Sequence, residues 1–203
     1  HLGTAPTAYK AMLATEPIIP SCAHPELVEG SSGNKNSPST SSGRAQEGQL
    51  ARALKTLRYC ISAGEHLPEA TWRAWQERTG IAITDGIGST EMMHIFVSAA
   101  GDDIRPGATG KAVPGYRATV LDADGRPLEE GVGRLAIKGP TGCRYLDDPR
   151  QRDYVVDGWN VTGDTYRKDA DGYYWYLARS DDMIVSSGYN IGAPEVENAL
   201  LSH

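Results

Sequence analysis

The hydrophobic positions at the start of the chain follow a helical period. Pro6 stands where a first helical turn tolerates proline, and Tyr9, Met12 and Leu13 fall on one helical face. The pattern then stops in a long stretch whose second half is rich in Gly and Ser and has no large apolar side chain. A segment of this composition buries too little surface to offset the entropy of ordering it, so we predict a disordered insertion over residues 16–44.

A regular order of strand and helix follows the insertion. Residues 57–62 are rich in β-formers, residues 68–80 have helical spacing between an opening proline and a closing glycine, and residues 81–84 are again apolar. Trp72 and Trp75 are three positions apart, and we expect them to pack in the core rather than to form a stacking surface for a ligand. The order strand, helix, strand predicts a parallel α/β sheet.

Beyond Pro114 the hydrophobic period changes to two. Residues 116–122 and 133–138 alternate on either side of an Asp-Gly turn, which predicts an antiparallel hairpin. Residues 159–167 and 173–177 predict a second hairpin, with an aromatic run that mostly builds its faces. The sequence therefore predicts an α/β part followed by a small antiparallel β-subdomain.

Composition and charge exclude several classes of function. The chain has 203 residues and a net charge of −6, without the basic stripe that would bind nucleic-acid phosphates. Its three cysteines, Cys22, Cys60 and Cys143, are too scattered for a disulfide framework or a metal cluster. No apolar run reaches the roughly 20 residues of a membrane helix and no signal pattern opens the chain, so we expect a cytoplasmic protein without membrane or nucleic-acid partners. Because it begins at His1 and its last apolar pattern is cut off, we expect a piece of a longer protein.

Two short polar segments follow the ends of predicted strands, where ligands bind in open α/β sheets. Residues 63–65 read Ala-Gly-Glu, and residues 85–91 read Asp-Gly-Ile-Gly-Ser-Thr-Glu. Paired glycines let the backbone approach a ligand, the Thr90 hydroxyl suits a phosphate oxygen, and the Glu91 carboxylate suits Mg²⁺. By themselves these residues fit a plain capped turn before a helix equally well, and a lone histidine such as His94 is more often structural than catalytic.

Charged side chains recur at fixed points in the stretch from residue 157 to residue 184. Asp164 and Arg179 are the candidates to grip a ribose and its phosphate, because an ionised carboxylate accepts hydrogen bonds from hydroxyl groups and a guanidinium binds phosphate. An ordinary exposed ion pair is the alternative. We predict half of a nucleotide site here, with the two earlier polar segments supplying its counterpart.

Taken in order, these segments resemble the adenylate-forming family, which includes acyl-CoA synthetases, luciferases and peptide-synthetase adenylation domains. The resemblance rests on six segments in one order: residues 62–65, 88–91, 162–164, 171–173, 178–182 and 188–197. Within the family, residues 85–96 and 139–147 look like the benzoate and 2-aminobenzoate CoA ligases. The resemblance covers nearly everything except the insertion.

The resemblance implies a fold class and a division into parts. The fold is α/β: the C-terminal part of the large adenylate-forming domain, with a parallel sheet and a small antiparallel β-subdomain, followed by the start of the small C-terminal domain. The parts are a helix (residues 1–15), the insertion (16–44), the α/β part (45–112), the β-subdomain (113–180) and the hinge with a truncated C-terminal domain (181–203). The family's phosphate loop would precede residue 1, and its C-terminal lysine would follow residue 203.

The resemblance also implies an activity and a site. The activity is an ATP-dependent ligation of an aromatic carboxylic acid to CoA through an acyl-adenylate, with ATP, Mg²⁺ and CoA. In the implied site, the adenine lies between Ala63, Gly64 and Glu65 on one side and Asp85, Gly86 and Ile87 on the other. Thr90 binds the α-phosphate, Glu91 binds Mg²⁺, Asp164 binds the ribose hydroxyls, and Arg179 binds ribose and phosphate. His94 and Ile95 lie beside the aromatic acid, Asp181 is the hinge, and Gly188 lies beside the pantetheine passage.

One departure and two alternatives accompany this resemblance. Many relatives place an aromatic residue where this chain has Ile87, so stacking on adenine would be weaker here, although an aliphatic residue at this point is itself like the benzoate group. The first alternative is a non-catalytic remnant that at most binds AMP. The second is an adenylation domain that loads a carrier protein in place of CoA.

Overall fold

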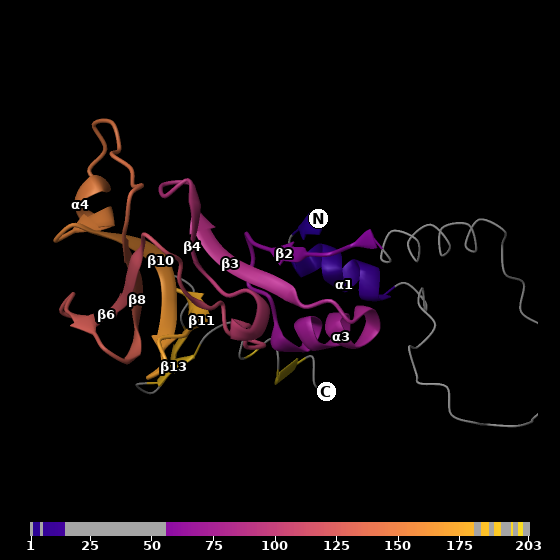
Figure 1. Cartoon of the computed structure of the whole chain (residues 1–203). Coiled ribbons are helices and arrows are strands. Elements are labelled where there is room, and N and C mark those ends of the chain that lie inside the picture. Colours follow the sequence, from indigo (N-terminus) through magenta and orange to yellow (C-terminus); the bar gives the residue numbers. More distant parts are fainter. Residues whose placement is uncertain are drawn as a thin grey trace, which may run out of the picture.

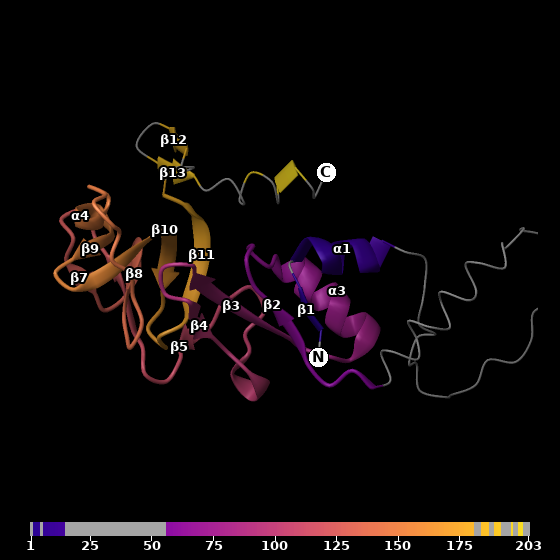
Figure 2. The same ribbon diagram turned by 90° about the horizontal axis from the view of Figure 1, so that it is seen from above.

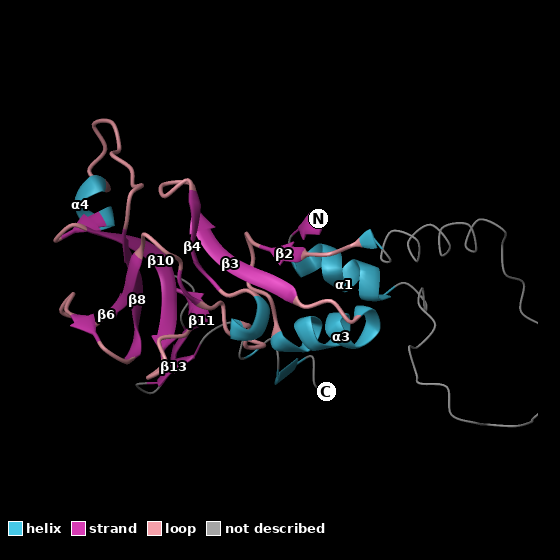
Figure 3. Cartoon of the chain, in the orientation of Figure 1, coloured by secondary structure: helices cyan, strands magenta, loops and turns pink. Residues whose placement is uncertain are grey.

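The computed structural model describes residues 2–4, 6–14, 56–180, 184–186, 189–191, 196 and 199–200. These residues build a mixed sheet with two helices beside it and an antiparallel sheet next to it (Figure 1). The helices gather at the mixed sheet, whereas strands dominate the other half (Figure 3). The predicted insertion at residues 16–44, the hinge residue Asp181 and Gly188 lie outside the described residues.

The first sheet begins with three parallel strands. Strand β1 (Leu2–Thr4) pairs with β2 (Cys60–Ser62), and β2 pairs with β3 (Ile83–Ser89). Helix α1 (Pro6–Ala14) follows β1, and helix α3 (Glu69–Thr79) joins β2 to β3. The predicted β-α-β unit and its parallel sheet are confirmed, with a first strand shorter than predicted.

The two helices pack on each other through aromatic side chains. Tyr9, Trp72 and Trp75 are buried, and the rings of Tyr9 and Trp75 meet edge to face with centroids 4.8 Å apart. The indole N–H of Trp72 donates a hydrogen bond of 2.8 Å to the carbonyl of Ile83, which fixes α3 to β3. Gly80 ends α3 in a left-handed conformation with φ 69°, which glycine adopts without strain. The predicted core role of both tryptophans is confirmed.

Strand β3 extends past its predicted end. It continues to Ser89 and pairs antiparallel with β4 (His94–Ser98), which in turn pairs with β5 (Lys111–Ala112). A Cβ atom at Gly88 would lie 2.5 Å from the carbonyl oxygen of His94, so only glycine fits where the two strands meet. The predicted end of this strand at residue 84 was therefore wrong: the glycines of the motif lie within the strand.

The second sheet is antiparallel, with the strand order β11-β10-β8-β6-β7 and with β9 paired to β10. Its elements are β6 (Arg117–Leu121), β7 (Pro127–Leu128), β8 (Gly131–Lys138), the short helix α4 (Gln151–Tyr154), β9 (Val155–Val156), β10 (Trp159–Lys168) and β11 (Tyr174–Arg179). Both predicted hairpins are confirmed. The pair β12 (Ile184–Ser186) and β13 (Tyr189–Ile191) is antiparallel and follows this sheet.

The segment after β4 ties the two sheets together (Figure 2). It contains the 3-10 helix η1 (Gly101–Asp103), and Gly110 and Tyr174 form a bridge with an N–H···O distance of 2.8 Å. Nearby, Arg105 pairs with Asp171 at 2.8 Å. This junction sets the spacing of the two sheets. Within the described residues, no helix is long and apolar enough to span a membrane.

Candidate functional site

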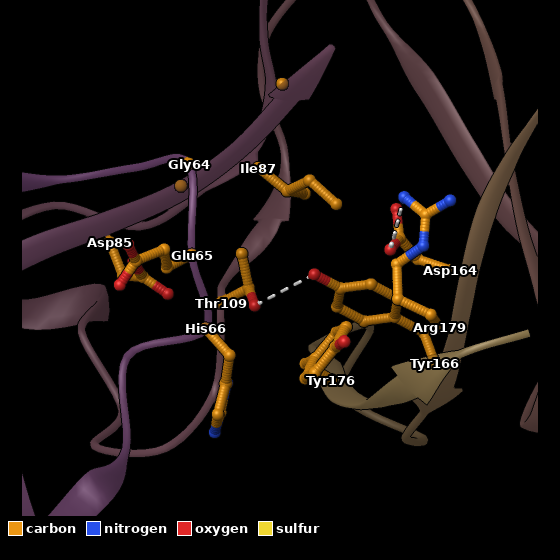
Figure 4. A pocket seen from close by; sticks show the side chains of 12 residues that line it. Gly64, Glu65, His66, Asp85, Ile87, Thr109, Asp164, Tyr166, Tyr176 and Arg179 are labelled. Atoms are coloured by element: carbon orange, nitrogen blue, oxygen red, sulfur yellow. Dashed lines mark hydrogen bonds and ion pairs between the residues drawn. The ribbon is translucent and has the colours of Figure 1, made fainter. Parts of the chain in front are cut away.

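A cavity of about 220 Å³ lies at the junction of the two sheets (Figure 4). It is lined by Gly64, Glu65, His66, Asp85, Gly86, Ile87, Gly88, Thr109, Asp164, Tyr166, Tyr176 and Arg179. The turn after β2 and residues within β3 form one side, and residues from β10 and β11 form the other (Figure 4). The structure therefore brings together seven of the residues that the sequence assigns to the adenosine part of the site.

The turn after β2 forms the first part of the lining. Gly64 has φ 90°, a conformation that favours glycine, and it allows the chain to turn away from the sheet. The Thr7 hydroxyl lies 2.8 and 3.0 Å from the two carboxylate oxygens of Glu65. Helix α1 thus fixes the orientation of this carboxylate at the cavity.

Asp85 contributes a buried carboxyl group from within β3. Its Oδ1 atom and the Ser62 hydroxyl are both buried. Burial raises the pKa of Asp85 to about 7, and the Gly86 N–H group and the Ser62 hydroxyl, which stabilise the ionised form, offset this only in part. The cavity therefore contains an acceptor whose charge changes near neutral pH.

Asp164 and Arg179 face each other across the pair β10 and β11. They are direct neighbours in the strand register, and their charged groups lie 3.9 Å apart. The Asp164 side chain is 17% exposed and that of Arg179 is 53% exposed, so the guanidinium reaches the solvent-exposed side of the cavity. A Cβ atom at Gly163 would lie 2.7 Å from Nη2 of Arg179, which shows that this glycine leaves room for the guanidinium.

We expect Gly163→Ala to displace the Arg179 guanidinium without unfolding the chain. The added methyl group meets only the end of a flexible side chain, so the melting temperature should stay within about 2 °C of the unsubstituted protein. The sequence resemblance implies AMP as the ligand; a partial loss of the charged contact, about 1.4 kcal/mol, should weaken binding of AMP about tenfold in a calorimetric titration.

Gly142→Ala is the matched control, because its Cβ would also meet a polar side chain, that of Asn160, at 3.3 Å but away from the cavity. Equal AMP affinity in Gly163→Ala and Gly142→Ala would contradict the role given to Gly163.

Aromatic side chains that the sequence did not assign to a ligand complete the lining. The rings of His66 and Tyr176 stack at 4.9 Å, and the ring of Tyr166 meets Tyr176 edge to face at 5.5 Å. Burial lowers the pKa of His66 to about 4, so the imidazole is neutral at pH 7. The Tyr166 hydroxyl lies 3.4 Å from that of Thr109. The contacts of His66 with Tyr176 and of Thr109 with Tyr166 join residues far apart in sequence, and no local pattern signals them.

Thr90 and Glu91 lie in the turn between β3 and β4, beyond the lining of the cavity. The Tyr145 hydroxyl donates a hydrogen bond of 2.9 Å to Oε1 of Glu91. Hydrogen bonds from its own N–H group and from Tyr145 lower the pKa of Glu91, so this carboxylate is ionised at neutral pH. Among the described residues there is no cluster of three or more His, Cys, Asp or Glu side chains that could hold a metal ion.

The remaining predicted site residues lie around the cavity rather than in its lining. Ala63 precedes the Gly64 turn. His94 and Ile95 lie in β4, where the His94 ring is parallel to that of Tyr116 at 6.3 Å. A Cβ atom at Gly86 would lie 2.8 Å from Cγ2 of Ile95, so Ile95 packs directly on β3. The roles of these three residues stay predictions.

A mixed α/β sheet joined to an antiparallel sheet, with a polar cavity at the junction, agrees with the fold that the resemblance to the adenylate-forming family implies. The sequence agrees: residues 1–144 match the family of AMP-binding enzymes. The chain belongs to the AMP-binding enzyme family.

Relatives and solved structures resemble large parts of the chain. It is 44% identical over 162 residues to the benzoate–CoA ligase of Thauera aromatica, covering 78% of this chain and 30% of that protein. The anthranilate CoA ligase AuaEII in complex with anthranoyl-AMP superposes with a TM-score of 0.68 and 44% identity, covering 72% of this chain and 29% of that one. ATP-bound MatB from Rhodopseudomonas palustris superposes with a TM-score of 0.76 and 27% identity, covering 100% of this chain and 35% of that one. The chain thus matches about a third or less of the length of each of these proteins.

Proposed function

We propose that this chain is the adenosine-binding part of an ATP-dependent acid–thiol ligase that acts on an aromatic carboxylic acid of the benzoate or 2-aminobenzoate type. In this reaction the carboxylate attacks the α-phosphate of ATP and releases pyrophosphate, and the CoA thiol then displaces AMP from the acyl-adenylate. No covalent bond to the protein is needed. Catalysis therefore depends on positioning and on neutralising phosphate charge.

The observation that carries the proposal is the pair Asp164 and Arg179 facing the Gly64 turn across one cavity. The Asp164 carboxylate is suited to accept hydrogen bonds from both ribose hydroxyls, and the Arg179 guanidinium is suited to the phosphate next to them. Tyr176 and Ile87 offer apolar surface for the base on the two sides of the cavity. The similarity to a benzoate–CoA ligase and to an anthranilate CoA ligase supports the aromatic acid as the substrate class.

Glu91 is suited to the Mg²⁺ ion of such a reaction. It is ionised and only partly buried, and Mg²⁺ bound to nucleotide phosphates usually needs only one or two protein carboxylates. A lone carboxylate is therefore compatible with the lack of a larger acidic cluster in the described residues. When bound, the ion would neutralise charge on the phosphates.

AMP release tests the proposal. We expect the protein produced from the full coding region around this chain to form AMP from ATP, CoA and benzoate or 2-aminobenzoate, as measured by a coupled assay. Acetate in place of the aromatic acid is the control, and it should give little AMP. No AMP with any aromatic acid would contradict the proposal.

Two further measurements separate the alternative functions. AMP release that needs a carrier protein instead of CoA would identify a carrier-loading adenylation domain. Calorimetry of this chain with AMP addresses the remnant: binding that Asp164→Ala abolishes indicates a surviving adenosine site, whereas no heat of binding indicates a remnant without it.

A further inference from the structure

A loop of the second sheet reaches the carboxylate that we propose for Mg²⁺. Residues 139–150 connect β8 to helix α4, and Tyr145 in this loop donates its hydroxyl hydrogen to Oε1 of Glu91. The two residues are 54 positions apart, one in the turn between β3 and β4 of the first sheet and the other in a loop of the second. The Glu91 carboxylate thus accepts a hydrogen bond from across the sheet junction, in addition to those from its own N–H group and from Ser89.

Three contacts hold Tyr145 in place. Its N–H group donates to Oε1 of Gln151 at 2.7 Å, and the Arg150 guanidinium lies over its ring at 4.9 Å from the centroid. The ring of Tyr154, from α4, meets it edge to face at 5.6 Å. Asp148 in turn holds Arg150 through a pair of 2.6 Å. Together these contacts fix the ring of Tyr145 and with it the direction of its hydroxyl group.

We propose that Tyr145 is a positioning residue for the metal-binding carboxylate of Glu91, an inference that rests on the proposed function. By occupying Oε1 it restricts rotation of the carboxylate, so that Oε2 points in one direction before the metal–nucleotide complex arrives. Residues that hydrogen-bond a metal ligand in this way typically change metal affinity about 10- to 100-fold when they are removed. The second sheet would thereby control metal binding at the first.

Tyr145→Phe tests this inference, because it removes the hydroxyl and keeps the ring with its contacts to Arg150 and Tyr154. In the protein from the full coding region, we expect the Kd of Mn²⁺ in the presence of ATP, measured by electron paramagnetic resonance, to rise about tenfold. The Mg²⁺ concentration for half-maximal adenylate formation should rise by the same factor. The Kd of AMP should stay within about twofold, because Tyr145 does not line the cavity.

Tyr173→Phe is the matched control. Its hydroxyl also donates to an oxygen at 2.8 Å, the carbonyl of Asp103, but it lies away from Glu91. In a Glu91→Gln background, Tyr145→Phe should cause no further loss, since Tyr145 acts through Glu91.

An unchanged Mn²⁺ constant in Tyr145→Phe would overturn the inference. So would a rise in the Mn²⁺ and AMP constants together with a lower melting temperature, which indicates a general structural role. Failure of the proposed function gives a different result: the unsubstituted protein would form no adenylate, whereas the Mn²⁺ constants are measured without turnover.

Discussion

Asp164→Ala should weaken AMP binding about 100-fold. The substitution removes a carboxylate that we propose to accept hydrogen bonds from both ribose hydroxyls, and hydrogen bonds to charged groups contribute about 1.5 kcal/mol or more each. The fold should change little, because the ion pair is 3.9 Å long and its Arg179 side chain is half exposed to solvent. Calorimetric titration with AMP and thermal unfolding measure the two effects separately.

Asp171→Ala is the matched control for Asp164→Ala. Asp171 also pairs with an arginine, Arg105 at 2.8 Å, and it lies in the turn that joins β10 to β11, away from the cavity. Its loss should leave AMP binding within about twofold and cost at most about 1 kcal/mol of stability. If both variants bind AMP as tightly as the unsubstituted protein, Asp164 and Arg179 are an ordinary surface ion pair and the adenosine site lies elsewhere.

Hydrophobic periodicity predicted the elements of this chain well, because each depends on local pattern. The helix with Tyr9 on its inner face, the β-α-β unit and the two hairpins need only spacing and turn residues. The extension of β3 was missed because Gly86 and Gly88 look like turn residues in sequence. In the structure they are needed where β4 approaches closely, and that approach is a tertiary contact which sequence spacing does not contain.

The residues of the candidate site also fall into two groups: those that the sequence predicted and those that depend on tertiary contacts. Gly64, in the turn after β2, and Asp164, within β10, are recognisable from residue type and motif, and both line one cavity. His66, Tyr166 and Tyr176 have no such signal, because the contact of His66 with Tyr176 joins segments 110 residues apart and because two tyrosines on one hairpin also fit plain core packing. The sequence therefore predicts the polar contacts of a ligand better than the apolar surface around it.

Asp85 should make the stability of the unliganded protein depend on pH. Its pKa is about 7 in the folded chain and about 4 in the unfolded chain. Between these values the unfolded state releases the proton first, so the contribution of Asp85 is fully present below pH 4, falls as the pH rises to 7 and is lost above it. A difference of three pKa units between the folded and unfolded chain corresponds to at most about 4 kcal/mol in the free energy of unfolding. We expect about 3 kcal/mol because some water reaches this carboxyl group.

Comparison with Asp85→Asn isolates this effect from that of His66. The pKa of His66 is lowered to about 4, so its contribution to stability rises with pH over nearly the same range and opposes that of Asp85. His66 is present in both proteins and cancels from the difference between their free energies of unfolding. Measured by urea denaturation, this difference should shift in favour of Asp85→Asn by about 3 kcal/mol from pH 4 to pH 8. A constant difference would mean that the Asp85 carboxyl group ionises as an exposed one does, and that β3 does not bury it.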